Sequence, residues 1–386
     1  MQCRLRRAQG GCRVRIVRVA NFVTPRSGGL RTALRHLGAG YKAAGHDPVL
    51  VVPGAGESDE TTDQGRVITL PGPLVPGMGG YRVLLDRGRL NSTLRALRPD
   101  RLEISDRSTL RWLGRWARHR GVPSMMVSHE SLDGLLRLFG PGVSRRAGDL
   151  INARTAAEHD QIVCTTQWAA AEFARLGVRN LRQVPLGVDL ERFTPANRDQ
   201  SMRTRWSAAD DVLLLHCGRL SPEKKPRRSL ETLAALRKSG VPAVLLVAGG
   251  GPLRPALQSE AADRGLPVRF LGHLSDQAKL SALLATVDVA IAPGPIETFG
   301  LSALETLASG TPVVVSSESA LPEVIGDAGM AASGEGSAYA EAVRSLLSRP
   351  EPVRRAAARA QAERFPWDRA VAGFLAAHQV PVAAPF

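Results

Sequence analysis

Short apolar segments alternate with longer amphipathic segments along most of the chain. In the first half, residues rich in Val, Ile and Leu predict strands at 13–20, 46–53, 67–70, 101–105, 124–128, 161–165 and 181–185. Helices are predicted between them at 30–45, 81–97 and 110–120, where apolar residues recur at helical spacing. Regular alternation of strands and helices is typical of a parallel sheet covered by helices, so the predicted fold class is α/β.

A second series of the same kind follows a predicted linker at 186–195. Its strands are expected at 212–217, 243–248, 268–271, 287–292 and 313–315, and a last apolar helix is expected at 369–378. A chain of 386 residues is long enough for two domains. We therefore expect two Rossmann-like domains facing each other across a cleft: residues 1–193, completed by the C-terminal helix within 369–386, and residues 194–368.

Two carboxylates lie between the last two predicted strands of the second series. Glu297 is in the loop, Gly300 provides a turn, and Glu305 falls in the first turns of the helix that follows. Ligands bind at such strand ends, beside helix starts. Carboxylates there would repel a phosphate but accept hydrogen bonds from hydroxyl groups, which favours a polyhydroxyl ligand. The alternative is a surface helix that happens to carry two acids.

A basic loop follows the first strand of the second series. Gly218, Arg219 and Lys224 are spaced so that the two cations could clamp a diphosphate. The chain has only five lysines, and two of them, Lys224 and Lys225, are in this loop. We expect Lys224 to be functional and Lys225 to be a bystander. Solvated loop charge is the alternative for both.

Two glycine loops and one histidine are further candidates. Gly28 and Gly29 precede the first helix, where backbone amides could approach a phosphate, although a simple turn would look the same. Gly250 lies in a glycine turn that is either structural or in contact with a nucleotide. His129 ends an apolar strand, where it either makes a structural hydrogen bond or faces the ligand.

The acid pair resembles the E-x7-E motif of retaining glycosyltransferases of family 4, which have the GT-B fold. The resemblance extends to a Gly-Thr-Pro-Val-Val continuation at 310–314, to a Gly-Val-Asp-x-x-x-Phe segment at 187–193, and to a Gly-Arg-x4-Lys pattern. It implies that Glu297 holds hydroxyls of the donor sugar and that Glu305 accepts from the ribose. It also implies that Arg219 and Lys224 neutralise the leaving diphosphate, that Gly28 and Gly29 assist, and that His129 contacts the sugar. Phe299, Gly300 and Leu301 complete the donor loop.

Segments in the first half of the chain resemble one subgroup of this family. Ala20-Asn-Phe, Ser27-Gly-Gly-Leu-Arg-Thr and Glu103-Ile-Ser-Asp-Arg are similar to segments of actinobacterial α-mannosyltransferases that act on phosphatidylinositol mannosides or glucuronosyl diacylglycerol. The resemblance implies GDP-mannose as donor and a lipid-linked acceptor. The rival hypotheses are a family 4 transferase with a UDP-sugar and another acceptor, a nucleotide-sugar epimerase, and a non-catalytic nucleotide-sugar-binding protein.

The formal net charge of +15 calls for an anionic partner. Nucleic acid is disfavoured because aromatic residues make up only 4% of the chain and no nucleic-acid module is found. The segment 81–98 interleaves arginines with a leucine series (Leu84, Leu85, Leu90, Leu94 and Leu97). Together with the loop 71–80 and residues 107–120, this segment favours docking on an anionic membrane. The alternative is a helix that packs its leucines inward.

The sequence shows no signal for secretion, for a membrane-spanning helix, for paired cysteines or for a metal site. Residues 1–12 are basic without an apolar core, which is unlike a signal peptide, and no run of about 18 apolar residues occurs. The four cysteines form no CxxC pair, which fits a reducing cytoplasm. No Asp-x-Asp motif follows a strand, so we expect no metal and no cofactor. These features predict a peripheral enzyme on the inner face of the plasma membrane.

Overall fold

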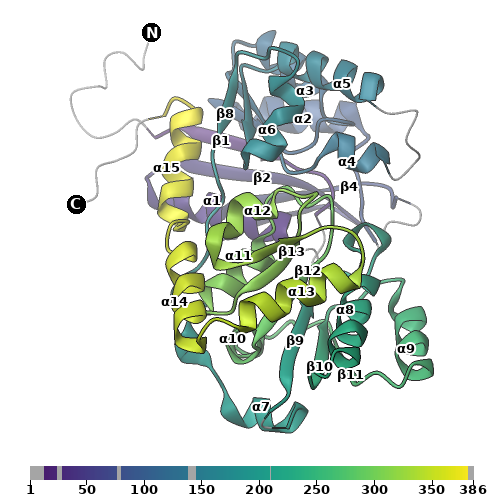
Figure 1. The fold of residues 1–386 in the computed structure, drawn as a ribbon. Helices are drawn as coiled ribbons and strands as arrows, with labels where there is room; N and C mark the ends of the chain where they lie inside the picture. Colours follow the sequence, from purple (N-terminus) through teal and green to yellow (C-terminus); the bar gives the residue numbers. More distant parts are fainter. Residues whose placement is uncertain (1–12, 24–27, 76–79, 138–144, 209, 381–386) are drawn as a thin grey trace. The chain divides into compact units, whose positions relative to one another are not determined.

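The computed structural model describes residues 13–23, 28–75, 80–137, 145–208 and 210–380 (Figure 1). The chain divides into two compact units. Unit 1 comprises Met1–Gly187 and Trp367–Phe386, and unit 2 comprises Val188–Pro366. The expected pair of α/β domains is thereby confirmed. The chain leaves unit 1 within the predicted linker and returns to it at Trp367, just before the predicted last helix.

Unit 1 is built on an eight-stranded sheet in the order β3-β4-β2-β1-β5-β6-β7-β8. All pairs are parallel except β3 with β4. Its strands are β1 (Arg15–Val19), β2 (Asp47–Gly54), β3 (Ser58–Thr62), β4 (Gly65–Pro71), β5 (Arg101–Ile104), β6 (Ser124–Ser128), β7 (Gln161–Cys164) and β8 (Leu181–Gln183). Its helices are α1 (Gly29–Ala43), α2 (Arg87–Leu97), α3 (Trp112–Arg118), α4 (Leu132–Arg137), α5 (Arg145–Glu158), α6 (Gln167–Ala174) and α15 (Trp367–Ala377).

Unit 2 has a fully parallel six-stranded sheet in the order β11-β10-β9-β12-β13-β14. Its strands are β9 (Val212–Cys217), β10 (Ala243–Ala248), β11 (Val268–Gly272), β12 (Val289–Ala292), β13 (Val313–Ser316) and β14 (Met330–Ala332). Its α-helices are α7 (Gln200–Trp206), α8 (Arg227–Lys238), α9 (Arg254–Asp263), α10 (Gln277–Thr286), α11 (Leu301–Ala308), α12 (Leu321–Ile325), α13 (Gly336–Leu347) and α14 (Glu351–Ala362). Short 3-10 turns are η2 (Pro195–Asn197), η3 (Pro222–Lys224) and η4 (Gly326–Ala328).

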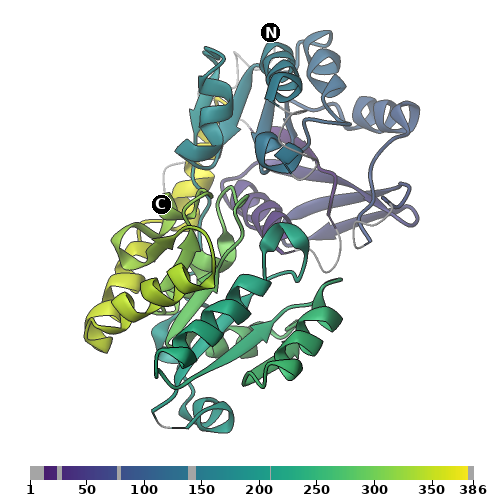
Figure 2. The same cartoon turned by 45° about the vertical axis from the view of Figure 1, so that its right-hand side comes forward.

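Helices cover the sheets closely enough to bury nearly continuous apolar strands. In unit 2, α8 and α13 lie side by side over the sheet (Figures 1 and 2). A Cβ atom at Gly336 would lie 2.3 Å from the Cβ of Glu231, so the first turn of α13 needs a glycine to reach α8. In unit 1, α15 packs on α1, where the rings of His36 and Trp367 stack with centroids 4.5 Å apart. The last helix is thus an integral part of unit 1.

The strand orders locate the expected ligand edge of each sheet. In a doubly wound sheet, ligands bind outside the carboxyl ends of strands at the point where the strand order reverses. In unit 2 that point lies between β9 and β12, which are neighbours although they are far apart in the sequence. In unit 1 it lies between β1 and β5. The loops that follow these strands are therefore where substrate groups should bind.

The structure differs from the predicted elements in unit 1. The helix predicted at 81–97 begins only at Arg87, because the Asp86 side chain accepts a hydrogen bond from the Arg89 amide and caps it. Before it, Arg82 forms an isolated antiparallel bridge with Leu74. The prediction of one long basic helix is wrong for residues 81–86. Strand β3 was not predicted, because it is a polar edge strand with no apolar alternation.

The membrane-facing surface proposed from the sequence is also partly wrong. Leu90, Leu94 and Leu97 are buried in the core of unit 1, and so is Leu84, whereas Leu85 is 54% exposed. Arg107 is only 8% exposed and belongs to the interior. Residues 76–79 of the predicted loop lie outside the described residues. Among the residues that the structure describes, no helix is long and apolar enough to cross a membrane.

Candidate functional site

The loops after β9 and β12 of unit 2 meet at the reversal of strand order. A Cβ atom at Gly294, after β12, would lie 3.4 Å from the Cα of Lys224, which is in the loop after β9. The Lys224 ammonium group donates to the Glu297 carboxylate. Their side chains are 26% and 25% exposed, so both remain accessible to a ligand. The structure thus brings together two of the residues singled out in the sequence.

Local structure explains how Lys224 reaches this position. Lys224 ends the 3-10 turn η3, and Lys225 adopts a left-handed conformation with φ of 48° that redirects the chain into α8. Arg219 lies earlier in the loop with 47% of its side chain exposed, and its Nη1 atom is 3.8 Å from the Glu223 carboxylate. One ammonium and one guanidinium group thus flank the loop. Both could neutralise negative charge on a departing diphosphate.

The glycine turn after β10, residues 249–251, packs against the loop that follows β9. A Cβ atom at Gly249 would lie 1.8 Å from the Gly218 carbonyl oxygen, and one at Gly251 would lie 2.4 Å from the Leu220 carbonyl oxygen. The Leu220 amide also donates to the Gly250 carbonyl at 2.9 Å. Gly249 and Gly251 are therefore required by close backbone packing. At Gly250 a Cβ atom would meet nothing within 4 Å, so packing does not require a glycine at this position.

The Glu297–Leu301 segment turns sharply into helix α11. Gly300 has φ of 75° and caps the helix, and a Cβ atom there would lie 2.1 Å from a Leu321 methyl carbon. Phe299 is 3% exposed and packs edge-to-face against Phe365, with ring centroids 6.0 Å apart. Leu301 is also buried. Phe299 and Leu301 therefore fix the turn with their side chains, and only their backbone groups can meet a donor.

Glu305, one helical turn into α11, is half-buried. Burial raises the pKa of its carboxyl group to about 8, with the nearby Arg192 charge opposing the shift and Asp189 adding to it. Glu305 therefore holds a proton at neutral pH when no ligand is bound. Hydroxyl groups donating to it would favour the ionised form, so ligand binding should be linked to proton release.

The remaining candidates belong to unit 1. His129 directly follows β6, and burial lowers the pKa of its imidazole to about 4, although the charge of Glu103 opposes the shift. It is therefore neutral at physiological pH and suited to hydrogen bonding rather than to charge neutralisation. Gly28 caps α1, Gly29 begins it, and the first turn carries no acidic residue. Residues 24–27 of the predicted glycine loop lie outside the described residues.

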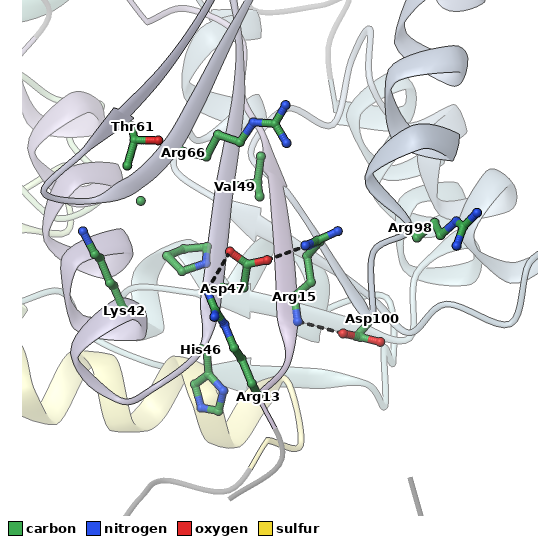
Figure 3. Close-up of a pocket in the computed structure, with 12 residues that line it drawn as sticks. Arg13, Arg15, Lys42, His46, Asp47, Val49, Thr61, Arg66, Arg98 and Asp100 are labelled. Carbon is green, nitrogen blue, oxygen red and sulfur yellow. Dashed lines mark hydrogen bonds and ion pairs between the residues drawn. The ribbon is translucent and has the colours of Figure 1, made fainter. Parts of the chain in front are cut away.

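A cavity of about 580 Å3 opens at the amino ends of β1, β2 and β4 (Figure 3). It is basic, and several of its cations already have partners. Arg15 Nε lies 2.6 Å from the Asp47 carboxylate, and Lys42 donates to the Thr62 carbonyl at 3.1 Å. Helices α1 and α2 also end here, where cations are favoured by the helix dipoles. This edge is opposite to the one where doubly wound sheets bind ligands, so we assign no substrate to it.

Sequence reasoning missed a polar cluster at the carboxyl ends of β1, β5 and β6. It contains Asn21, Asp106, Arg107, Asn152 and Glu172, all buried. Asp106 and Arg107 are the second and third residues after β5, at the reversal of strand order in unit 1. The signal in the sequence for this cluster was an acidic residue next to a basic one, shortly after a buried strand. The motif resemblance includes both residues, but the sequence pattern predicted Arg107 as part of a basic surface rather than of a buried cluster.

The comparisons with known proteins agree with this geometry. A family model described as "Glycosyl transferase 4-like domain" matches residues 28–218, and one described as "Glycosyl transferases group 1" matches residues 197–363. The chain is 52% identical over 369 residues to a GDP-mannose-dependent alpha-(1-6)-phosphatidylinositol dimannoside mannosyltransferase of Mycobacterium tuberculosis, with 94% of this chain and 95% of the relative covered. It is 29% identical to a GDP-mannose-dependent alpha-mannosyltransferase of Mycolicibacterium smegmatis, with coverage of 78% and 79%.

Solved structures support the fold independently. A sucrose-phosphate synthase from Thermosynechococcus elongatus matches with a TM-score of 0.77 at 19% identity, covering 95% of this chain and 98% of that one. WaaG, a glycosyltransferase involved in lipopolysaccharide biosynthesis, matches with a TM-score of 0.69 at 18% identity, covering 96% and 100%. The GT-B fold expected from the sequence is thereby confirmed. With the Lys224–Glu297 pair at the strand ends of a doubly wound sheet, two matching family models and a transferase 52% identical over 94% of the chain, this chain belongs to glycosyltransferase family 4.

Proposed function

We propose that this protein transfers mannose from GDP-mannose to a lipid-linked acceptor, a phosphatidylinositol mannoside or glucuronosyl diacylglycerol, with retention of the anomeric configuration. The observation that carries the proposal is the 52% identity, over 94% of the chain, to a mannosyltransferase named for GDP-mannose and phosphatidylinositol dimannoside. The Lys224–Glu297 pair supports it, because it offers one group for phosphate and one for sugar hydroxyls.

In the proposed mechanism, Glu297 accepts hydrogen bonds from hydroxyls of the mannose. Lys224, no longer paired with Glu297, then binds the diphosphate. The bond between the anomeric carbon and the phosphate oxygen breaks, and Arg219 and Lys224 stabilise the GDP that leaves. The acceptor hydroxyl forms the new bond on the same face, and its proton passes to the departing phosphate oxygen. Neutral His129 donates to or accepts from the sugar, and the amides of Gly28 and Gly29 assist at the phosphate.

We propose that no metal ion is needed, because Arg219 and Lys224 supply the positive charge that a divalent cation would supply elsewhere. Within the described parts of the chain, no three His, Cys, Asp or Glu side chains gather in a metal-binding group. Transfer should therefore continue unchanged in excess EDTA. Loss of transfer in EDTA that is restored by Mg²⁺ or Mn²⁺ would contradict this proposal.

The deciding experiment measures transfer of radiolabelled sugar into a lipid extract from GDP-mannose, UDP-glucose and UDP-N-acetylglucosamine in parallel. Label in the lipid phase from GDP-mannose alone is the expected result. Label from a UDP-sugar would keep the enzyme class but overturn the donor. An altered nucleotide sugar without any acceptor product would indicate an epimerase, and binding without turnover would indicate a non-catalytic protein.

We also propose that the protein works on the cytoplasmic face of an anionic membrane. Leu74 and Leu85 are each 54% exposed in unit 1. Leu85 lies two residues before α2, and Leu74 forms a bridge with Arg82 in the segment that leads to this helix. Exposed apolar side chains in a segment that leads into an arginine-rich helix suit an interfacial contact.

The double variant L74D/L85D is therefore expected to reduce sedimentation with vesicles containing anionic phospholipid by about tenfold, since each substitution puts a negative charge in place of an apolar side chain that would enter the membrane interface. Val353→Asp is the control, because Val353 is 58% exposed but lies on α14 of unit 2. Equal loss of binding in the double variant and the control would reject this surface.

The raised pKa of Glu305 predicts that nucleotide binding depends on pH. Its pKa of about 8 without ligand means that ribose hydroxyls, which favour the ionised carboxylate, bind with release of a proton. Affinity for GDP should therefore rise with pH, by up to about tenfold per pH unit below pH 8, and then level off. Calorimetry between pH 7 and 8.5 avoids the phosphate titration near pH 6. Glu305→Gln should bind with no such slope, and an equally steep slope in that variant would refute the assignment.

A further inference from the structure

Two consecutive residues after β5 hold the loops on either side of that strand. β5 lies between β1 and β6 in the sheet of unit 1. Asp106 interacts with the segment that follows β1, and Arg107 interacts with the segment that follows β6. The dipeptide thus lies at the reversal of strand order and links both neighbouring loops.

On the β1 side, Asp106 and Asn21 form a buried hydrogen-bonded group. The Asn21 side-chain amide donates to the Asp106 carboxylate at 2.9 Å, and its carbonyl oxygen accepts from the Leu84 amide at 2.8 Å. Thr109 donates to the same carboxylate at 2.6 Å. These bonds fix the chain where it leaves β1 and where it approaches α2.

On the β6 side, Arg107 is surrounded by acceptors. Its guanidinium group lies 3.3 Å from the Glu172 carboxylate of α6 and donates to Asn152 of α5 at 2.9 Å. It also donates to the backbone carbonyl of Glu130, the residue after His129. Arg107 thus contacts the His129 loop directly through the main chain.

Glu172 holds the remainder of that loop. Its carboxylate accepts from the backbone amides of Leu132 at 3.2 Å and Asp133 at 3.1 Å, and from the Ser131 hydroxyl. Ser131 in turn accepts from the Gly134 amide at 2.8 Å. These are the amides of the first turn of α4, which have no partners within the helix. Glu172 therefore satisfies groups that would otherwise be left unpaired in the protein interior.

Burying the charges of Arg107 and Glu172 costs desolvation free energy, and this cost has a use if the pair fixes the geometry of the loop. The side chains of Arg107 and Glu172 are 8% and 6% exposed, and a buried ion pair of this kind often contributes less stability than apolar packing would. Its contacts converge on one segment, residues 130–134, directly after His129. A ring held in a single orientation is what transition-state contact with a sugar requires.

We propose that Arg107 and Glu172 are positioning residues that hold the His129–Gly134 loop in the geometry needed for sugar transfer. They act through the loop and do not touch substrate. The proposal rests on the proposed role of His129 in the transferase reaction.

The test uses the conservative variants R107K and E172Q, with R203K as matched control. Arg203 also makes a buried ion pair, at 2.9 Å to Asp288, but this pair lies at the amino ends of β9 and β12 in unit 2. The full-length variants are compared by amide hydrogen exchange of the peptide covering residues 130–134, by thermal unfolding, and by kcat and KM for transfer from GDP-mannose.

We expect exchange of that peptide to be at least about tenfold faster in R107K and E172Q, since the Leu132 and Asp133 amides lose a carboxylate acceptor or its orientation. We expect kcat to fall by about tenfold or more, with donor KM changed less than about threefold, because misplacement of a group by even 1 Å can cost on the order of 100-fold. R203K should keep both the exchange rate of this peptide and kcat.

Unchanged exchange in both variants would overturn the proposal, and so would faster exchange with unchanged kcat. His129→Ala tests the role of His129 separately from the role of Arg107 and Glu172. If H129A transfers at the normal rate, the role of His129 fails, whereas the exchange data still decide whether Arg107 and Glu172 hold the loop.

Discussion

Replacing Glu297 with alanine is expected to lower the transfer rate by about 10²- to 10³-fold, the usual effect of removing one preorganised electrostatic contact at a reacting centre. Stability should hardly change. Both partners of the Lys224–Glu297 pair are about a quarter exposed, and pairs near the surface contribute only about 0–1 kcal/mol. The measurement is the initial rate of label transfer from GDP-mannose, with thermal unfolding recorded in parallel.

Two variants make this result specific. Glu363→Ala removes a carboxylate that pairs with Arg359 at 2.8 Å on α14, away from the strand ends, and should leave transfer intact. Lys224→Met should also be slow. Because Lys224 and Glu297 are in contact, the double variant should lose less than the product of the two single losses. A near-normal rate for E297A would remove Glu297 from the mechanism.

Replacing Glu103 with alanine is expected to destabilise unit 1 by about 3–5 kcal/mol, the usual cost of removing one partner of a buried charge cluster. Glu103 is fully buried on β5 and accepts from the Tyr41 hydroxyl at 2.9 Å. Its carboxylate also lies 3.1 Å from His378 Nε2, just after α15. Without Glu103, the fully buried guanidinium group of Arg18 would lose its nearby countercharge.

The same cluster predicts how stability depends on pH. Burial by itself would raise the pKa of Glu103, but the hydrogen bond and charge of His378, with the charge of Arg18, hold it below the usual value of 4.5. An acid whose pKa is lowered by folding stabilises the protein above its unfolded pKa. This contribution is lost as the pH falls below 4.5 and through the folded pKa, and E103A should lack this part of the acid sensitivity.

Tryptophan fluorescence can follow this unfolding in unit 1, which contains four of the five tryptophans, Trp112, Trp116, Trp168 and Trp367. Glu60→Ala is the control, because Glu60 is an exposed acid on β3 of the same sheet. If E103A and E60A unfold at the same denaturant concentration, the cluster does not stabilise unit 1.

Most of the architecture could be predicted from the sequence, because it depends on local patterns. The strands at 124–128, 212–217 and 243–248 match the structure residue for residue, since each is a short apolar run bounded by polar or turn-forming residues. The predicted helix extends too far, to residue 81, for an equally local reason: Asp86 caps the helix, and its side chain marks the start at Arg87. The polar strand β3 shows where the apolar pattern fails, because its formation depends on pairing with β4.

By itself the sequence determined the fold class and the family, because both depend on local patterns and on motif spacing along the chain. It also predicted Arg219, Lys224, Glu297 and Glu305 as site residues from the same spacing. Only the tertiary structure decided which charges are buried and what they meet. It placed Lys224 against Glu297, buried Phe299 and Leu301 in the core of unit 2, and turned Arg107 from an expected surface cation into the buried partner of Glu172. The physical reason is that desolvation and pairing depend on residues far apart in the chain, as Arg107 and Glu172 are, and no local pattern records them.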